Sequence, residues 1–104
     1  MKIIYVADDG NSFDDEFECE NYEFILNHPH LKDVHIYDEC GVKRENLLSD
    51  ETYFCADTVI VSTQDALNDL HSLAEYMGHL SYGDINSIGR WVFSHKQETF
   101  VKLN

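Results

Sequence analysis

Carboxylate side chains dominate the stretch from Ala7 to His30, ADDGNSFDDEFECENYEFILNHPH. Eight Asp or Glu residues fall within it, and no Lys or Arg does. Neighbouring carboxylates on a helix repel one another, and no basic residue one turn away relieves that repulsion. The density of negative charge therefore predicts a surface that meets something positive. The alternative is a solvated helix face that only keeps a small protein soluble.

The predicted partner-binding surface continues beyond this stretch, because a second acidic pair follows the next strand. Carboxylates can take the contacts that Lys and Arg side chains of a partner would otherwise make with phosphates. The same charge repels nucleic acid and anionic membrane, so direct binding to either is not expected. We predict an interface core of Asp14, Asp15, Glu16, Glu20 and Glu23, with Asp38 and Glu39 as its rim.

A histidine pair, His28-Pro29-His30, ends the acidic stretch and is the candidate metal site. In an extended segment this spacing projects both imidazoles to the same side, where they can chelate zinc. A four-coordinate structural site would be completed by Cys19 and Cys40, with His35 and Asp33 as alternative ligands. The spacing matches no zinc signature. In the competing interpretation, Cys19 is a core residue, Cys40 is an ordinary thiol in a turn, and His28 and His30 cap the end of the helix.

Catalytic signatures are missing from the sequence. It contains no G-x-S-x-G, P-loop, H-E-x-x-H or G-x-G-x-x-G motif. Carboxylates are so abundant that some pair will always resemble a glycosidase site, and none stands out as a pair. We therefore predict a protein that is not an enzyme. The alternative to this prediction is a small hydrolase that acts on a cationic or sugar substrate.

Secondary-structure patterns predict an α+β fold in a single domain covering residues 1–104. Helical spacing is clearest from residue 63 to 77, with Gly78 placed to end that helix. A second helix is expected from Asp15, as its N-cap, to Asn27. Strands are expected at residues 2–7, 34–37, 58–62, 90–94 and 99–103, with a short returning piece at 42–48 and a loop at 49–52. Two helices should pack on one face of a mostly antiparallel sheet of about four to five strands.

Burial predictions follow from the same patterns. Cys19, Tyr22, Ile25 and Leu26 form an apolar stripe on the first helix. Phe13 and Phe17 are expected to pack at the start of that helix. Further along the chain, we expect Cys55, Trp91 and Phe93 in the core and His79 at the surface or in a loop.

Composition places the chain among small folded proteins. Its 104 residues are 43% hydrophobic and carry a net charge of −13, which suits one domain with a modest core. Three cysteines without C-x-x-C spacing imply no disulfide framework. The opening MKIIYVADDG resembles no signal peptide, and no apolar run approaches a membrane span. We expect a reduced, cytoplasmic protein.

The opening pattern also resembles a group of known sequences. The pattern A-x-D-G-x-x-F-x-D-x-x-E-C-x-x-Y-E is formed by Ala7, Asp9, Gly10, Phe13, Asp15, Glu18, Cys19, Tyr22 and Glu23. It is similar to the strand-turn-helix start of small proteins encoded by phages and prophages of Firmicutes. Some small acidic proteins of that origin are type II-A anti-CRISPR proteins.

This resemblance implies a partner and a mechanism. Type II-A anti-CRISPR proteins bind the RNA-guided DNA endonuclease of the bacterial host and stop it loading or cleaving target DNA. Such a nuclease holds nucleic acid in strongly positive channels, to which an acidic protein is attracted. The alternative hypothesis is a zinc-stapled phage accessory protein whose acidic face serves solubility or binds another basic host protein.

Overall fold

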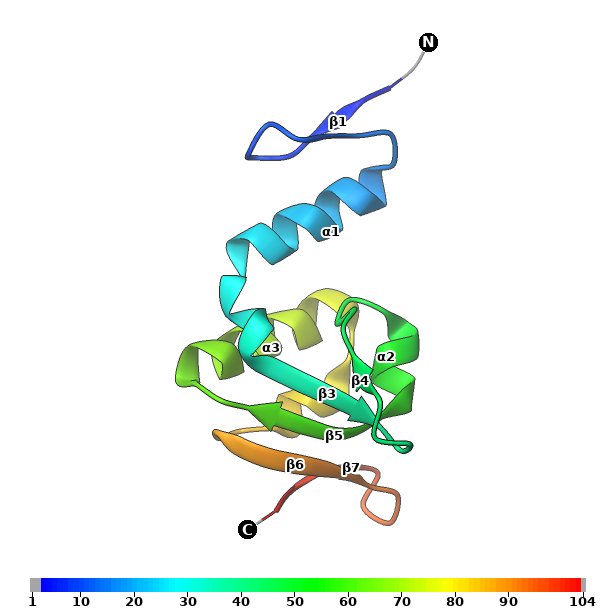
Figure 1. The fold of residues 1–104 in the computed structure, drawn as a ribbon, viewed down its shortest axis with the longest axis vertical. Coiled ribbons are helices and arrows are strands. Elements are labelled where there is room, and N and C mark those ends of the chain that lie inside the picture. Colours follow the sequence, from blue (N-terminus) through cyan, green and yellow to red (C-terminus); the bar gives the residue numbers. More distant parts are fainter. Residues whose placement is uncertain (1–2, 104) are drawn as a thin grey trace.

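The computed structural model describes residues 3–103 and divides them into two parts (Figure 1). Residues 3–27 form what we call the arm, and residues 28–103 form the body. The molecule is elongated, with extents of 54 × 24 × 22 Å, because the arm projects from one side of the body. The prediction of one domain over residues 1–104 stays a prediction.

The body is built on a five-stranded antiparallel sheet in the order β4-β3-β5-β6-β7. The strands are β3 (Val34–Asp38), β4 (Lys43–Arg44), β5 (Ala56–Val61), β6 (Gly89–Ser94) and β7 (Thr99–Leu103). Register pairs Ile36 with Val59, and Val59 in turn with Trp91. These three side chains are buried on one face of the sheet. The predicted α+β class and the antiparallel sheet are therefore confirmed.

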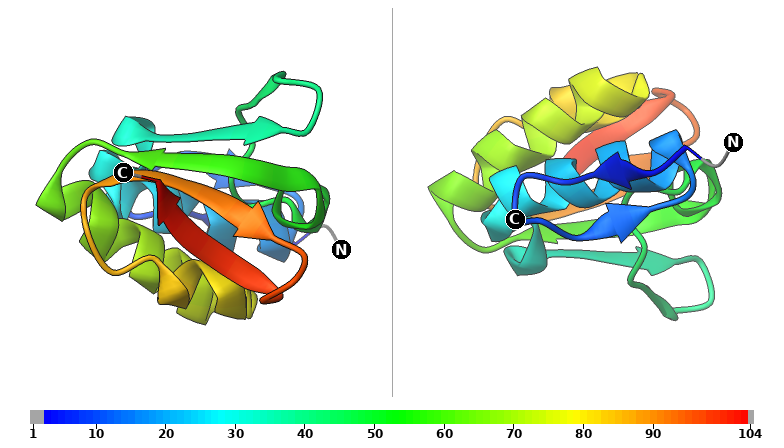
Figure 2. Two further views of the ribbon diagram at one scale, coloured as in Figure 1. Left: turned by 90° about the horizontal axis from the view of Figure 1, so that it is seen from below. Right: turned by 90° about the horizontal axis from the view of Figure 1, so that it is seen from above.

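Helix α3 (Gln64–Met77) packs on the buried face of this sheet (Figure 2). Its stripe of Ala66, Leu67, Leu70, Leu73 and Ala74 is buried, as helical spacing predicts. The Thr63 hydroxyl accepts a hydrogen bond from the Ala66 N–H and caps the start of the helix. Gly78 ends it in the left-handed conformation at φ 73°.

Two further helical segments complete the body around the core. Helix α2 (Asp50–Cys55) begins at Ser49, whose hydroxyl accepts from the Glu51 N–H. The predicted loop at 49–52 is thus wrong, because Ser49 caps a short helix. The 3-10 segments η1 (Pro29–Asp33) and η2 (Leu80–Asp84) contribute Leu31 and Tyr82 to the core.

The arm consists of a small hairpin and one helix. Strands β1 (Tyr5–Val6) and β2 (Ser12–Phe13) pair only with each other among residues 3–103. Helix α1 (Glu16–Asn27) begins at the predicted cap, where the Asp15 carboxylate accepts from the Phe17 N–H at 2.8 Å. It also ends where Pro29 required. The first strand therefore does not join the five-stranded sheet.

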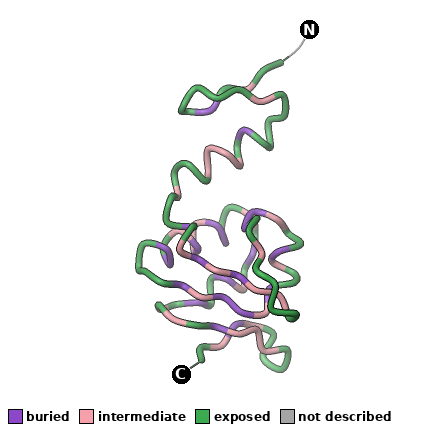
Figure 3. The backbone as a smooth tube through the Cα atoms, viewed as in Figure 1, coloured by how far each residue is buried: buried purple, intermediate pink, exposed green. Residues whose placement is uncertain are grey.

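Few apolar side chains of the arm are buried (Figure 3). Ala7 and Cys19 are buried, and the ring of Phe13 lies against Tyr22 with centroids 5.0 Å apart. The other apolar positions of α1 differ from expectation, since Phe17 is 74% exposed and Ile25 is 50% exposed. Leu26 is also exposed. The hairpin covers only the face of α1 that carries Cys19 and Tyr22.

Candidate functional site

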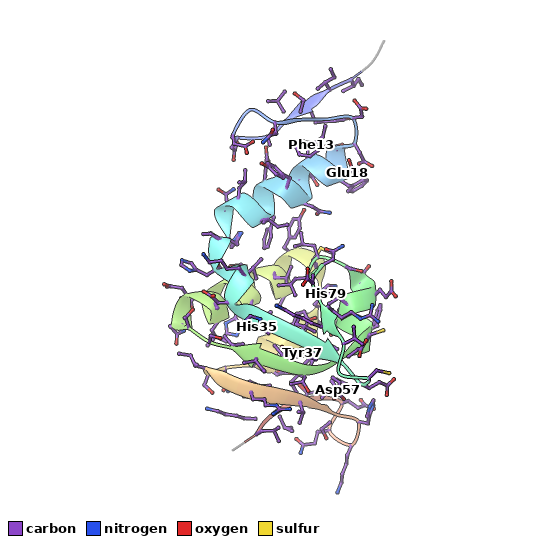
Figure 4. The ribbon with its side chains drawn as sticks, viewed as in Figure 1. Phe13, Glu18, His35, Tyr37, Asp57 and His79 are labelled. Carbon is purple, nitrogen blue, oxygen red and sulfur yellow. The ribbon has the colours of Figure 1, made fainter. Side chains whose placement is uncertain are left out.

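The arm carries all of the predicted interface core. Asp14, Asp15, Glu16, Glu20 and Glu23 belong to α1 or to the segment directly before it. Across residues 3–27 the arm has eight Asp or Glu residues and no Lys or Arg. Glu18 lies on the same helix as these residues (Figure 4). The structure therefore places a dense negative charge on the part of the molecule that projects farthest from the core.

A hydrogen-bond network holds the hairpin of the arm to its helix. The Tyr22 hydroxyl donates to the Asp9 carboxylate at 2.5 Å, and the Asn11 side-chain amide donates to the Tyr22 oxygen at 2.7 Å. The bond from Tyr22 and a backbone bond from Asn11 hold the pKa of Asp9 below its ordinary value of 3.8. The same bond, with burial, raises the pKa of Tyr22 above 10.0. The network therefore favours the charged form of Asp9 and the neutral form of Tyr22.

Tyr76 of α3 joins the arm to the body. Its ring stacks on Phe24 of α1 with centroids 4.4 Å apart, and its hydroxyl donates to the Asn21 side chain at 3.0 Å. Asn21 and Phe24 share one stripe of the helix, and Phe17 is on that stripe one turn earlier. There, however, Phe17 is 74% exposed. The helix face that meets the body thus continues into an exposed aromatic side chain.

The predicted rim lies apart from the arm, at the turn after β3. Asp38 stabilises this turn through its side chain. Its carboxylate accepts hydrogen bonds from the N–H groups of Cys40 and Val42 and from Arg44 Nε at 3.2 Å. The bond from Val42 is the largest cause of a lowered pKa for Asp38. Glu39 is exposed beside it. The structure therefore does not join these two residues to the acidic surface of the arm.

The four predicted zinc ligands come from the arm, from the junction after it and from the turn after β3. Cys19 is buried in the arm, and burial raises the pKa of its thiol, with the Glu23 and Asp8 carboxylates adding to that effect. His28 stacks on Phe24 at 4.0 Å, and its Nδ1 lies 2.7 Å from the Phe24 carbonyl oxygen. His30 lies in η1 and not in an extended segment. Cys40 is exposed in the turn at the other end of β3.

These positions give the predicted metal site no geometric support. Within residues 3–103, no group of three or more His, Cys, Asp or Glu side chains is arranged to hold a metal ion. The alternative ligand His35 lies on β3 (Figure 4). A zinc site therefore stays a prediction from the sequence.

Comparison with known proteins adds no further assignment. No family model, curated protein or solved structure matches the chain. These comparisons therefore indicate no function for the chain. None of the helices in residues 3–103 has the length and apolar character needed to cross a bilayer.

An aromatic cluster in the body was not predicted from the sequence. The Tyr53 ring stacks on His79 at 4.2 Å and meets the edge of Tyr82 at 4.9 Å. His79 lies in the connection before η2, as one of the two expectations had it, but it is 2% exposed and therefore not a surface residue. Its Nε2 lies 2.8 Å from the Asp50 carboxylate. A histidine just past a helix-ending glycine gives no sequence signal for such burial, because the ring stacked on it, Tyr53, comes from a distant segment.

Cys55 is also placed differently from expectation. It is exposed at the end of α2 and does not belong to the core. The short helix explains the difference, since it turns residue 55 away from the buried face before β5 begins at Ala56. Trp91, in contrast, is 6% exposed and lies in the core as predicted.

Proposed function

We propose that this protein acts by binding, and that its acidic arm docks onto a basic surface of a protein partner. The observation that carries the proposal is the composition of the arm, which combines eight carboxylates and no Lys or Arg with exposed apolar side chains. Val6 is 62% exposed and Phe17 is 74% exposed. Interfaces of moderate affinity combine apolar anchors with a charged rim in this way.

Charge also argues for which kind of partner the arm takes. Two copies of the arm would bring eight negative charges against eight, so self-association through this surface is opposed by repulsion. A cationic groove would gain from the same charges and would bury the apolar side chains. We propose the type II-A RNA-guided DNA endonuclease as this partner, on the resemblance of the opening pattern, and an anti-CRISPR role in which the arm competes for DNA-binding surface.

A charge-matched pair of variants tests the proposal. One variant changes Glu16, Glu18 and Glu20 of the arm to Gln, and the control changes Glu45, Glu75 and Glu98 of the body to Gln. Both move the net charge from −13 to −10 by the same arithmetic, and all six residues are exposed. At about 0.5 kcal/mol for each exposed ion pair, the arm variant should lose about 1.5 kcal/mol, or about tenfold in affinity.

The measurement is binding to the purified endonuclease at two salt concentrations, together with a plasmid-protection assay in cells carrying a type II-A system. We expect the arm variant to lose affinity and protection while the body variant keeps both. Affinity should fall as salt rises, because exposed charges are screened. Equal effects of the two variants would show that the arm is not the docking surface, and no binding at low salt would remove the nuclease as partner.

A further inference from the structure

A cavity of about 280 Å³ lies in the body, away from the acidic arm. The C-terminal end of α2 forms one wall with Tyr53 and Phe54, and the β6–β7 hairpin forms another with Phe93 and Phe100. Asp57, which also borders it, lies near the β3–β4 turn, whereas Glu18 lies on the arm (Figure 4). We call this cavity the aromatic pocket.

The walls of the aromatic pocket are supported from behind. Phe93 meets Phe100 with centroids 5.3 Å apart and nearly perpendicular planes. The Tyr53 ring stacks on buried His79, and its hydroxyl accepts a hydrogen bond from the Ser81 N–H at 3.1 Å. These contacts fix the orientation of the rings before any ligand arrives. A preformed pocket costs less ordering on binding than a flexible one.

The charged groups that border the pocket have one sign. Glu39 and Asp57 are both in its lining, and no Lys or Arg is among the described residues that line it. His95 also lines the pocket, and its ring meets Phe93 edge-on with centroids 5.1 Å apart. Glu39 and Asp57 also border a second hollow on the face of the sheet that α3 leaves uncovered, together with Tyr37, Ile60 and one basic residue, Arg90. The two carboxylates are therefore shared by the aromatic pocket, which is open to solvent, and a groove beside it.

Aromatic rings and carboxylates together select a cation. A guanidinium group stacks on aromatic faces and accepts no hydrogen bonds, but donates two parallel ones to a carboxylate. We propose that the aromatic pocket binds an arginine side chain of a protein partner, with Asp57 and Glu39 as acceptors. The groove beside the pocket would receive the residues that flank this arginine. Only the identity of the protein that carries the arginine rests on the proposed function.

A small-molecule titration tests the pocket without any partner protein. The probe is N-acetyl-arginine amide, and the matched control is N-acetyl-citrulline amide, which has the same shape without the charge. Chemical shifts of the full-length protein are followed by two-dimensional NMR up to about 50 mM probe, which detects dissociation constants in the millimolar range. We expect saturable shifts at Tyr53, Phe93 and Asp57, and affinity for the arginine probe at least about tenfold above that for citrulline.

Variants separate the pocket from other acidic surfaces. Asp57→Asn combined with Glu39→Gln should weaken the arginine probe by at least about tenfold. Glu45→Gln combined with Glu75→Gln removes the same charge elsewhere on the body and should change nothing. The variant with Glu16, Glu18 and Glu20 changed to Gln should bind the probe normally, so that failure of the arm proposal and of this one are distinguishable.

Three outcomes would overturn the proposal. They are equal binding of the arginine and citrulline probes, unchanged affinity in the Asp57→Asn, Glu39→Gln variant, and absence of saturable shifts at the pocket. Backbone shifts of the variants away from residues 39 and 57 report whether each variant keeps its fold. Saturable binding that depends on charge and on these two carboxylates supports the proposal.

Discussion

Removal of the Tyr82 hydroxyl should stabilise the protein. Tyr82 is fully buried, and its hydroxyl has no hydrogen-bond partner within residues 3–103. Burial raises the pKa of this group above its ordinary value of 10.0, because the charged form loses its hydration. A buried hydroxyl without a partner costs about 1–3 kcal/mol. Replacing it with hydrogen keeps the ring and its contacts with Tyr53 and Phe100.

For Tyr82→Phe we expect a gain of about 1 kcal/mol in the free energy of unfolding. In a chain of this size that corresponds to a rise of about 4–8 °C in Tm. The assay is urea denaturation followed by Trp91 fluorescence, with comparison of midpoints at a constant m-value. Trp91 is a suitable reporter because it is the one tryptophan of the chain and lies in the core.

The neighbouring tyrosine provides the matched control. Tyr53 lies 4.9 Å from Tyr82 between ring centroids, but its hydroxyl accepts from the Ser81 N–H. Tyr53→Phe leaves that N–H without its partner and should cost about 1 kcal/mol. The two substitutions remove the same atom and should shift the midpoint in opposite directions. A loss of stability in Tyr82→Phe would refute the reasoning, because it would mean that the hydroxyl has a bonding partner in solution.

Three further predictions concern the arm and the end of α3. If the arm docks as proposed, Phe17→Ala should weaken partner binding by about 2 kcal/mol, because an aromatic ring is lost from the interface. It should change the free energy of unfolding by less than about 0.5 kcal/mol, because the ring is exposed. Calorimetry measures the binding and urea denaturation the stability, and a large loss of stability would contradict the exposure of the ring. The Asp9–Tyr22 hydrogen bond should stabilise the arm between an acid and an alkaline limit. Because the pKa of Asp9 is lowered in the folded protein, its stabilising contribution is present above pH 3.8 and is lost as the pH falls through the folded-state pKa. Because the pKa of Tyr22 is raised, its contribution is full below pH 10.0 and is lost as the pH rises through the folded-state pKa. NMR contacts between Phe13 and Tyr22 report this range, and an unchanged range in Asp9→Asn would argue against it. Gly78→Ala should lower the free energy of unfolding by about 1 kcal/mol, measured by urea denaturation, because of its positive φ, although open space surrounds the added methyl group. No loss would mean that the helix end relaxes.

Local signals in the sequence explain which parts of the fold were predictable. The stripe of α3, its Thr63 cap and Gly78 all lie within one contiguous segment and all agree. The β6–β7 hairpin was predictable for the same reason, since its strands are neighbours in sequence. Helix α2 was missed because six residues are too few to show a helical period, and Ser49-Asp50-Glu51 is equally typical of a loop.

The candidate sites show the complementary limit. The charge of the arm is visible in the sequence because it is a property of one stretch. Its exposed Phe17 and Leu26 are not, since an apolar stripe predicts burial whether or not a partner element of the same chain exists. The aromatic pocket depends on Glu39, Tyr53 and Phe93 from three separate segments. No local sequence pattern predicts that these three segments come together.

The separation of the arm from the core has a consequence for how this protein can change over generations. The buried cluster of the body starts at Leu31, and among residues 3–30 the structure packs only Phe24 of the arm against it. Substitutions across most of residues 3–23 therefore leave the interior of the body unaltered. Under the proposed function, the docking surface can therefore change while the part that keeps the chain folded stays the same.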